Sequence, residues 1–202
     1  MNGRPSPSPS TLSRGQVTGD RGQRDPASEG AHPPVRVAVA EPADHDAIAA
    51  LNVAAYAEFR ARIGEDAWGR MHANITAVAG AAAAAVQLVA REGGQVLGSV
   101  LYYPPGTTIP PLPPEWASLR TLAVAPAARG RGVAAALMRE CVARARAEGA
   151  PVLGLYTTEM MAPAIALYER LGFVRDAELP PRHGHPCWRY RLDLGDGNGT
   201  AG

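Results

Sequence analysis

Glycine and arginine alternate in the run Arg129-Gly-Arg-Gly132, between a predicted strand and a predicted helix. A helix that begins directly after such a turn has unpaired backbone N–H groups at its positive end, and these groups bind anions. Gly130 and Gly132 lack side chains that would keep an anion off the backbone. Arg129 and Arg131 add planar cations suited to phosphate. The spacing therefore predicts a phosphate or diphosphate site.

The elements that must position this turn follow from the periodicity of apolar residues. Residues 119–124 alternate as a strand does, and Pro126 ends them because proline has no N–H for a ladder. Apolar residues recur at helical spacing over 133–147. Loops are expected at 104–114 and 180–186. The other predicted strands are residues 35–39, 86–91, 95–103, 152–156, 173–174 and 187–192, and the other helices begin near Asp44 (a candidate cap), Glu65 and Pro163.

Length and composition allow one ordinary domain with extra segments. The chain has 202 residues, 46% of them hydrophobic, and a net charge of +1, which gives no support to nucleic-acid binding. Residues 1–34 and 195–202 are predicted to be disordered tails that flank a domain at 35–194. We expect neither a signal peptide nor a membrane span, because the apolar-looking stretch 77–86 is far shorter than the roughly 20 residues that a span needs. The two cysteines indicate a reducing, cytoplasmic compartment.

A dinucleotide-binding fingerprint is the main alternative for the glycine turn. Gly130, Gly132 and Ala135 have the required spacing, but that fingerprint belongs to an early strand–helix unit and needs an acid about 20 residues later. Here three or more strands come first, and the acid after the next strand, Glu159, is too distant. The NAD(P) interpretation is therefore disfavoured.

A second motif lies near the end of the last long helix, where the sequence reads Leu167-Tyr-Glu-Arg-Leu-Gly-Phe173. Together with the Arg129–Ala134 loop and the preceding Leu122-Ala-Val124, it resembles the GNAT superfamily of acetyl-CoA-dependent N-acetyltransferases over residues 35–192. The resemblance implies an α/β fold, with a mixed, twisted central sheet of about seven strands and helices on both faces. Two central strands should splay apart to admit acetyl-CoA, and the resemblance allows a homodimer.

The same resemblance implies roles for individual residues. Leu122, Ala123 and Val124 would pair their backbone with the pantetheine arm, and one N–H there would hydrogen-bond the thioester carbonyl. Tyr168 would protonate the departing thiolate; the alternative is a core aromatic residue with an ordinary hydrogen-bond partner. Backbone N–H groups of six residues would hold the pyrophosphate, namely Arg129, Gly130, Arg131, Gly132, Val133 and Ala134.

One position departs from the family pattern. Many relatives carry asparagine where this chain has Met161, and methionine cannot make the amide hydrogen bond to the cofactor arm. Thr158 is a candidate substitute, and backbone groups alone are the alternative.

The general base and the acceptor are not fixed by a motif. Glu159 and Glu115 are candidate bases, and a water chain would replace both. Tyr56 and Glu58, with Phe59, lie on the early helix that lines the acceptor side in relatives. An antibiotic, a polyamine, an amino acid and a protein N-terminus all remain open as acceptors.

The segment His183-Gly-His185-Pro-Cys187 carries metal-capable side chains, but three such close ligands without a fourth make a poor zinc site. We expect no metal and a loop over the acceptor cleft. Cys141 is predicted to point into the core, and Cys187 is far along the chain from both motifs, so no covalent enzyme intermediate is expected.

The predicted function is acetyl transfer from acetyl-CoA to a primary amine of a small molecule or peptide, by direct attack. The alternative is a CoA-binding sensor of the same fold without turnover, for which the methionine at 161 is the sequence hint.

Overall fold

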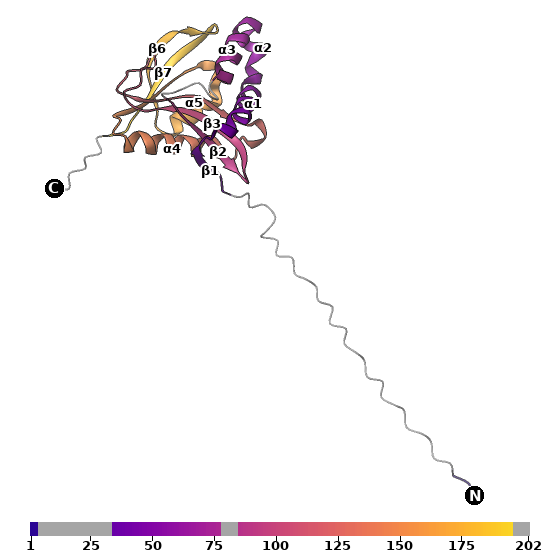
Figure 1. Cartoon of the computed structure of the whole chain (residues 1–202). Coiled ribbons are helices and arrows are strands. Elements are labelled where there is room, and N and C mark those ends of the chain that lie inside the picture. Colours follow the sequence, from indigo (N-terminus) through magenta and orange to yellow (C-terminus); the bar gives the residue numbers. More distant parts are fainter. Residues whose placement is uncertain (4–33, 78–84, 196–202) are drawn as a thin grey trace, which may run out of the picture. The chain divides into compact units, whose positions relative to one another are not determined.

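The computed structural model describes residues 1–3, 34–77 and 85–195, so nearly all of the two predicted tails lies outside the described residues. Seven strands form one sheet in the order β1-β2-β3-β4-β5-β7-β6 (Figure 1). Only the β4–β5 pair is parallel. Their bounds are β1 Arg36–Val39, β2 Val86–Glu92, β3 Gln95–Tyr103, β4 Ala117–Val124, β5 Val152–Thr158, β6 Val174–Arg182 and β7 His185–Asp193.

Helices cover both faces of the sheet, as predicted (Figure 1). The alternation along β2 shows why: Leu88 packs with the α4 side, whereas its neighbour Val89 packs with Ile48 of α1. The α-helices are α1 His45–Tyr56, α2 Arg60–Ile63, α3 Glu65–Ala77, α4 Val133–Ala147 and α5 Ala162–Arg170, and the 3-10 turns are Pro42–Asp44, Ala57–Phe59, Pro126–Ala128 and Glu159–Met161.

A buried polar chain fixes α3 against α1 and the sheet. Asn52 of α1 is fully buried, and its amide donates to the Ile75 carbonyl of α3 over 3.0 Å. The Ser99 hydroxyl of β3 donates to the Asn52 carbonyl oxygen, also over 3.0 Å. Because both partners of each bond are buried, breaking either bond would leave an unsatisfied polar group. These bonds therefore hold α3 in the position from which it lines the functional site.

The two parallel strands separate almost at once. β4 and β5 are paired only at Ala117 with Leu153 and at Ser118 with Gly154, although both strands continue for several residues. The expected splay of two central strands is thus present, and it opens the sheet where β4 leads toward α4.

One local expectation was wrong. Residues 180–186 were expected to form a loop because of their prolines, but they belong to a hairpin in which β6 runs to Arg182 and β7 starts at His185. β6 is an edge strand, where a missing N–H costs no ladder bond. The candidate cap Asp44 is indeed the N-cap residue of α1. Its carboxylate makes no bond to the first turn of α1; it accepts from the Glu41 N–H at 2.7 Å, in the capping box of the preceding 3-10 turn, and pairs with Arg91.

Candidate functional site

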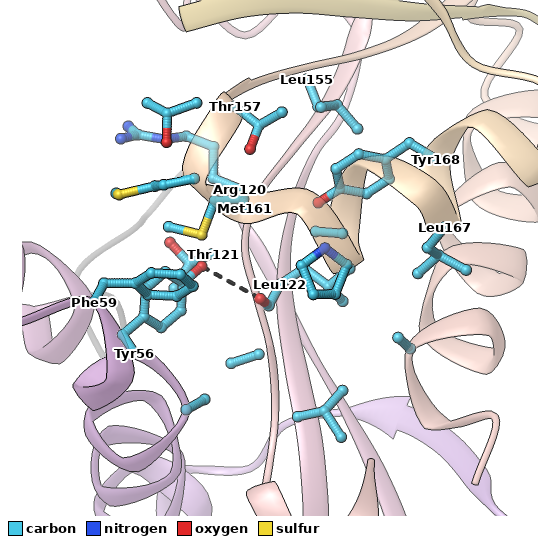
Figure 2. A pocket seen from close by; sticks show the side chains of 18 of the residues that line it. Tyr56, Phe59, Arg120, Thr121, Leu122, Leu155, Thr157, Met161, Leu167 and Tyr168 are labelled. Atoms are coloured by element: carbon cyan, nitrogen blue, oxygen red, sulfur yellow. Dashed lines mark hydrogen bonds between the residues drawn. The ribbon is translucent and has the colours of Figure 1, made fainter. Parts of the chain in front are cut away.

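A pocket of about 590 Å³ occupies the gap between β4 and β5. Its walls come from the ends of α1 and α3, the outer half of β4, the turn before α4, the end of β5, the first turns of α5, and the β6–β7 turn. Figure 2 shows Tyr56 and Phe59 on one side of it and Tyr168 on the other. The pocket therefore brings together both sequence motifs and the early helix.

A β-bulge shapes the middle of the pocket wall. Arg120 pairs with Leu101 and Ala123 with Ser99, so two β4 residues, Thr121 and Leu122, lie opposite a single β3 residue. Thr121 has a φ of +53°, a left-handed conformation that non-glycine residues rarely adopt. Because of the bulge, Thr121 and Leu122 are not in regular register with β3. Neither residue is paired with β5, since the β4–β5 pairing ends at Ser118. It thus presents backbone polar groups to the pocket.

The glycine turn has the form that an anion site needs. Gly130 has a φ of +76°, and Gly132, the N-cap of α4, has a φ of +78°. A Cβ atom placed on either residue would meet no other atom within 4 Å, so the space over this turn is open. The first N–H groups of α4 have no partner within the helix and form the positive end of its dipole.

The arginines of the turn point elsewhere. The Arg129 guanidinium donates to the Glu58 carboxylate at 2.7 Å and to the Ala55 carbonyl at 3.1 Å. Arg131 is paired with Glu92 at 2.5 Å. The expectation that these two side chains serve as phosphate ligands is therefore not met by their placement. The turn offers backbone N–H groups instead, and Glu58 is engaged by Arg129.

Tyr168 is held in place by the end of α5. The Phe173 N–H donates to the Tyr168 carbonyl and the Gly172 N–H to the Glu169 carbonyl, both at 3.0 Å, which is a Schellman motif. Gly172 has a φ of +90°, so the sequence Leu-Gly-Phe supplies the residue that this cap requires. The motif brings the rings of Phe173 and Tyr168 to a centroid distance of 5.8 Å.

The phenol of Tyr168 is protonated at neutral pH. The side chain is 5% exposed, and burial raises its pKa above the ordinary value of 10.0. Within the described part of the chain its hydroxyl has no hydrogen-bond partner, and Figure 2 shows that hydroxyl directed into the pocket. A buried, protonated hydroxyl facing a cavity is able to give a proton to a group bound there.

Met161 lines the pocket with its thioether, and Thr158, three residues earlier in the chain, lines it too. The Oγ1 atom of Thr158 is buried and lacks a hydrogen-bond partner among the described residues. An unpaired buried hydroxyl costs free energy unless something binds it. Thr158 lines the pocket at the end of β5, while its Oγ1 atom lies beneath the pocket surface.

The predicted bases are not brought into the pocket. Glu159 is exposed and accepts a hydrogen bond from the Trp188 indole at 3.2 Å. Glu115 is exposed in the segment before β4. Neither is among the lining residues, so their positions give no support to a role as base.

Cys187 lies on the pocket wall, although it is distant in sequence from both motifs. It is the register partner of Thr158 on the neighbouring strand. The side chain is fully buried, and burial raises its thiol pKa, as it raises that of Cys141 to about 12. Both thiols are protonated at neutral pH and are poor nucleophiles. Neither thiol therefore gives a reason to replace the predicted direct attack of the amine by a covalent enzyme intermediate.

The β6–β7 turn brings Arg182 and His183 to the pocket wall. Over residues 1–3, 34–77 and 85–195, no three His, Cys, Asp or Glu side chains gather as a metal site would require. In the same ranges, no helix combines the length and apolar character needed to cross a bilayer.

Sequence reasoning missed a cationic, aromatic part of the wall. Arg120, Tyr156 and Arg182 all line the pocket, and they come from three different strands. Arg120 was a usable signal, because it is the one charged residue of its strand, and a charged side chain in a central strand has to face water or pair with a charge.

Comparison with known proteins agrees with this geometry. Residues 45–173 match the family described as the acetyltransferase (GNAT) family. N-acetyltransferase 8 of Mus musculus is 37% identical over 90 residues, which is 45% of this chain and 39% of that protein. This chain therefore spans about two fifths of that relative's length.

Solved structures show the same fold. The histone acetyltransferase HPA2 and related acetyltransferase from Corynebacterium glutamicum is 25% identical, with a TM-score of 0.61, over 83% of this chain and 99% of that one. yncA from Salmonella typhimurium, which was solved with its cofactor acetyl-CoA, is 21% identical, with a TM-score of 0.58, over 83% of this chain and 98% of its own.

Proposed function

The chain belongs to the acetyltransferase (GNAT) family, and we propose that it transfers an acetyl group from acetyl-CoA to a primary amine by direct attack in a ternary complex. The observation that carries the proposal is the composition of one pocket. A glycine turn at the head of a helix, a bulged strand and a buried phenol all line it. The acceptor is a small molecule or a peptide amine, and the two free, buried thiols fit a reducing cytoplasm.

The residues present fit acetyl-CoA. The backbone N–H groups of Arg129–Ala134 would hold the pyrophosphate. They are accessible because Gly130 and Gly132 have no Cβ atom and no other atom fills that space. The backbone of Leu122, Ala123 and Val124 would pair with the pantetheine arm, because this part of β4 has left β5. Thr158 would supply the polar contact that Met161 lacks. When bound, acetyl-CoA supplies an acyl group activated as a thioester.

The chain's own groups then act on the two ends of the reaction. A backbone N–H at the Leu122 bulge donates to the carbonyl oxygen, where negative charge develops as the amine attacks. The C–N bond forms as the C–S bond breaks. The Tyr168 hydroxyl donates its proton to the departing sulfur. The amine loses a proton as the C–N bond forms, and this proton restores the Tyr168 hydroxyl. Tyr56 and Glu58, which line the same pocket, would contact the acceptor.

The test combines binding and turnover. Calorimetry should detect saturable binding of acetyl-CoA to the folded protein, and CoA release should depend on an added primary amine. Tyr168→Phe should lower kcat by about 10²-fold or more while acetyl-CoA still binds. Binding without release for any amine, together with no effect of Tyr168→Phe on any measured property, would support a CoA sensor instead.

A further inference from the structure

Two arginines share one aromatic ring on the pocket wall. The guanidinium carbon of Arg182 lies 4.6 Å from the ring centroid of Tyr156, and that of Arg120 lies 5.4 Å from it. The three residues come from β6, β5 and β4, and all three line the pocket. Each cation–π contact holds its guanidinium at the wall, so the two cations are positioned before any ligand arrives.

Neither cation is neutralised by a carboxylate. Within the described residues, Arg120 and Arg182 make no ion pair, whereas Arg129, which also lines the pocket, is paired with Glu58. Arg120 is half-buried and Arg182 is exposed, so water screens part of their mutual repulsion, and an anionic group bound at this wall would offset the rest. The pocket wall therefore carries two positive charges that no carboxylate of the described residues compensates.

The place of this site in the pocket separates it from the phosphate end. The last paired positions of β4 and β5 are Ser118 and Gly154, so Arg120 and Tyr156 are each two residues beyond the point of separation. The bulge follows at Thr121 and Leu122, and the glycine turn lies still further along the chain, after β4 ends. The charge of Arg120 reaches the hydroxyl of Tyr56, whose pKa it lowers against the larger, raising effect of burial. The cations thus adjoin the bulge, on the side away from the diphosphate cradle.

We propose that the acceptor is a primary amine that also carries an oxyanion, in the simplest case a carboxylate, which Arg120 and Arg182 bind. The inference rests on the proposed acetyl transfer and narrows its substrate class. Guanidinium groups bind carboxylate and phosphonate through the same paired N–H donors, so the shared chemistry is that of an oxyanion. Polyamines and other polycations are disfavoured, because they would bring further positive charge to this wall.

The experiment compares four amines of similar size: β-alanine, its neutral amide, 2-aminoethylphosphonate and a diamine. CoA release gives kcat/KM for each. Calorimetry on the CoA-saturated protein gives the affinity for each without turnover. We expect β-alanine or the phosphonate to exceed the amide by about ten- to a hundredfold in kcat/KM, with the diamine lowest. The carboxylate-to-phosphonate ratio identifies the preferred oxyanion.

Variants assign the preference to the two arginines. Arg120→Gln and Arg182→Gln should each lower the ratio of acid to amide by about tenfold, mainly through KM, and Arg120→Lys should restore part of it. Arg139→Gln is the matched control, since Arg139 is exposed on α4 and lies outside the pocket. Circular dichroism checks that each variant is folded.

Three outcomes overturn the inference. If the neutral amide matches β-alanine and the phosphonate in kcat/KM, acetyl transfer stands and the oxyanion site falls. If no amine releases CoA, the proposed function fails, and calorimetry decides the inference alone. Equal affinity for acid and amide, or an affinity difference that survives both glutamine variants, would then refute it.

Discussion

The hydroxyl of Tyr56 donates a hydrogen bond of 3.3 Å to the carbonyl of Leu122, which joins the last residue of α1 to the bulge of β4. Burial raises the pKa of Tyr56 to about 12, so the phenol keeps its proton and remains a donor at neutral pH. The bond holds the Leu122 carbonyl in place. The backbone N–H groups of the same bulge are the ones proposed to hydrogen-bond the thioester carbonyl. We therefore expect Tyr56 to position the bulge, in addition to the acceptor contact proposed for it.

Replacing Tyr56 by phenylalanine should remove this bond and leave the ring in place. We expect kcat/KM for the amine to fall about five- to tenfold, which corresponds to the loss of one ordinary hydrogen bond. Thermal unfolding should change little. Tyr103→Phe is the control, because Tyr103 is also buried but does not line the pocket. Equal kinetic effects of the two variants would refute a positioning role for Tyr56.

The open space over Gly132 should be needed for acetyl-CoA. Gly132→Ala places a methyl group in that space and forces a non-glycine residue to a φ of +78°. Gly149 is also left-handed, with a φ of +71° in the Schellman motif that ends α4. It too has no atom near an added Cβ, and it does not line the pocket. Gly149→Ala is therefore a matched control for backbone strain, which costs about 1–2 kcal/mol in either variant.

Urea unfolding and calorimetry separate the two effects. Both alanine variants should lose a similar free energy of unfolding, while only Gly132→Ala should raise the Kd for acetyl-CoA, by about tenfold or more. An unchanged Kd for Gly132→Ala would remove the glycine turn from the binding site.

Much of the fold was predictable because its elements are periodic. The expected helix at 133–147 and strand at 95–103 have the bounds seen in α4 and β3. The place of Tyr168 was also predictable, since Gly172 and Phe173 form the cap that ends α5 behind it. In such segments each local preference agrees with the tertiary structure.

The features that sequence reasoning missed depend on partners from other strands. The bulge at Thr121 is set by the register of β4 against β3, and threonine is an ordinary strand residue. Cys187 reaches the pocket because β7 pairs with β5, which chain distance does not reveal. The prolines of β6 are tolerated because that strand lies at the edge of the sheet.

The pH dependence of kcat should show no titration of the Tyr168 phenol below pH 10. Because burial raises the pKa of Tyr168 above 10.0, its acid form persists through pH 10. We expect kcat with a saturating amine to rise with pH as the amine loses its proton, and to show no falling limb below pH 10. Tyr168→Phe should lower kcat at every pH in this range. A falling limb near pH 8 or 9 that disappears in Tyr168→Phe would contradict this assignment.

Thr158 offers a test in which stability and binding change in opposite directions. Its buried Oγ1 lacks a partner among the described residues, so Thr158→Val removes an unsatisfied polar atom and keeps the shape of the side chain. The free energy of unfolding should rise by about 1 kcal/mol in the free protein. If the hydroxyl contacts the cofactor arm in place of the asparagine that Met161 replaces, the Kd for acetyl-CoA should rise about fivefold.

Thr157→Val, one residue earlier on the same strand and also on the pocket wall, is the control. Higher stability with an unchanged Kd would show that Thr158 does not hold the arm, and would leave that contact to the backbone.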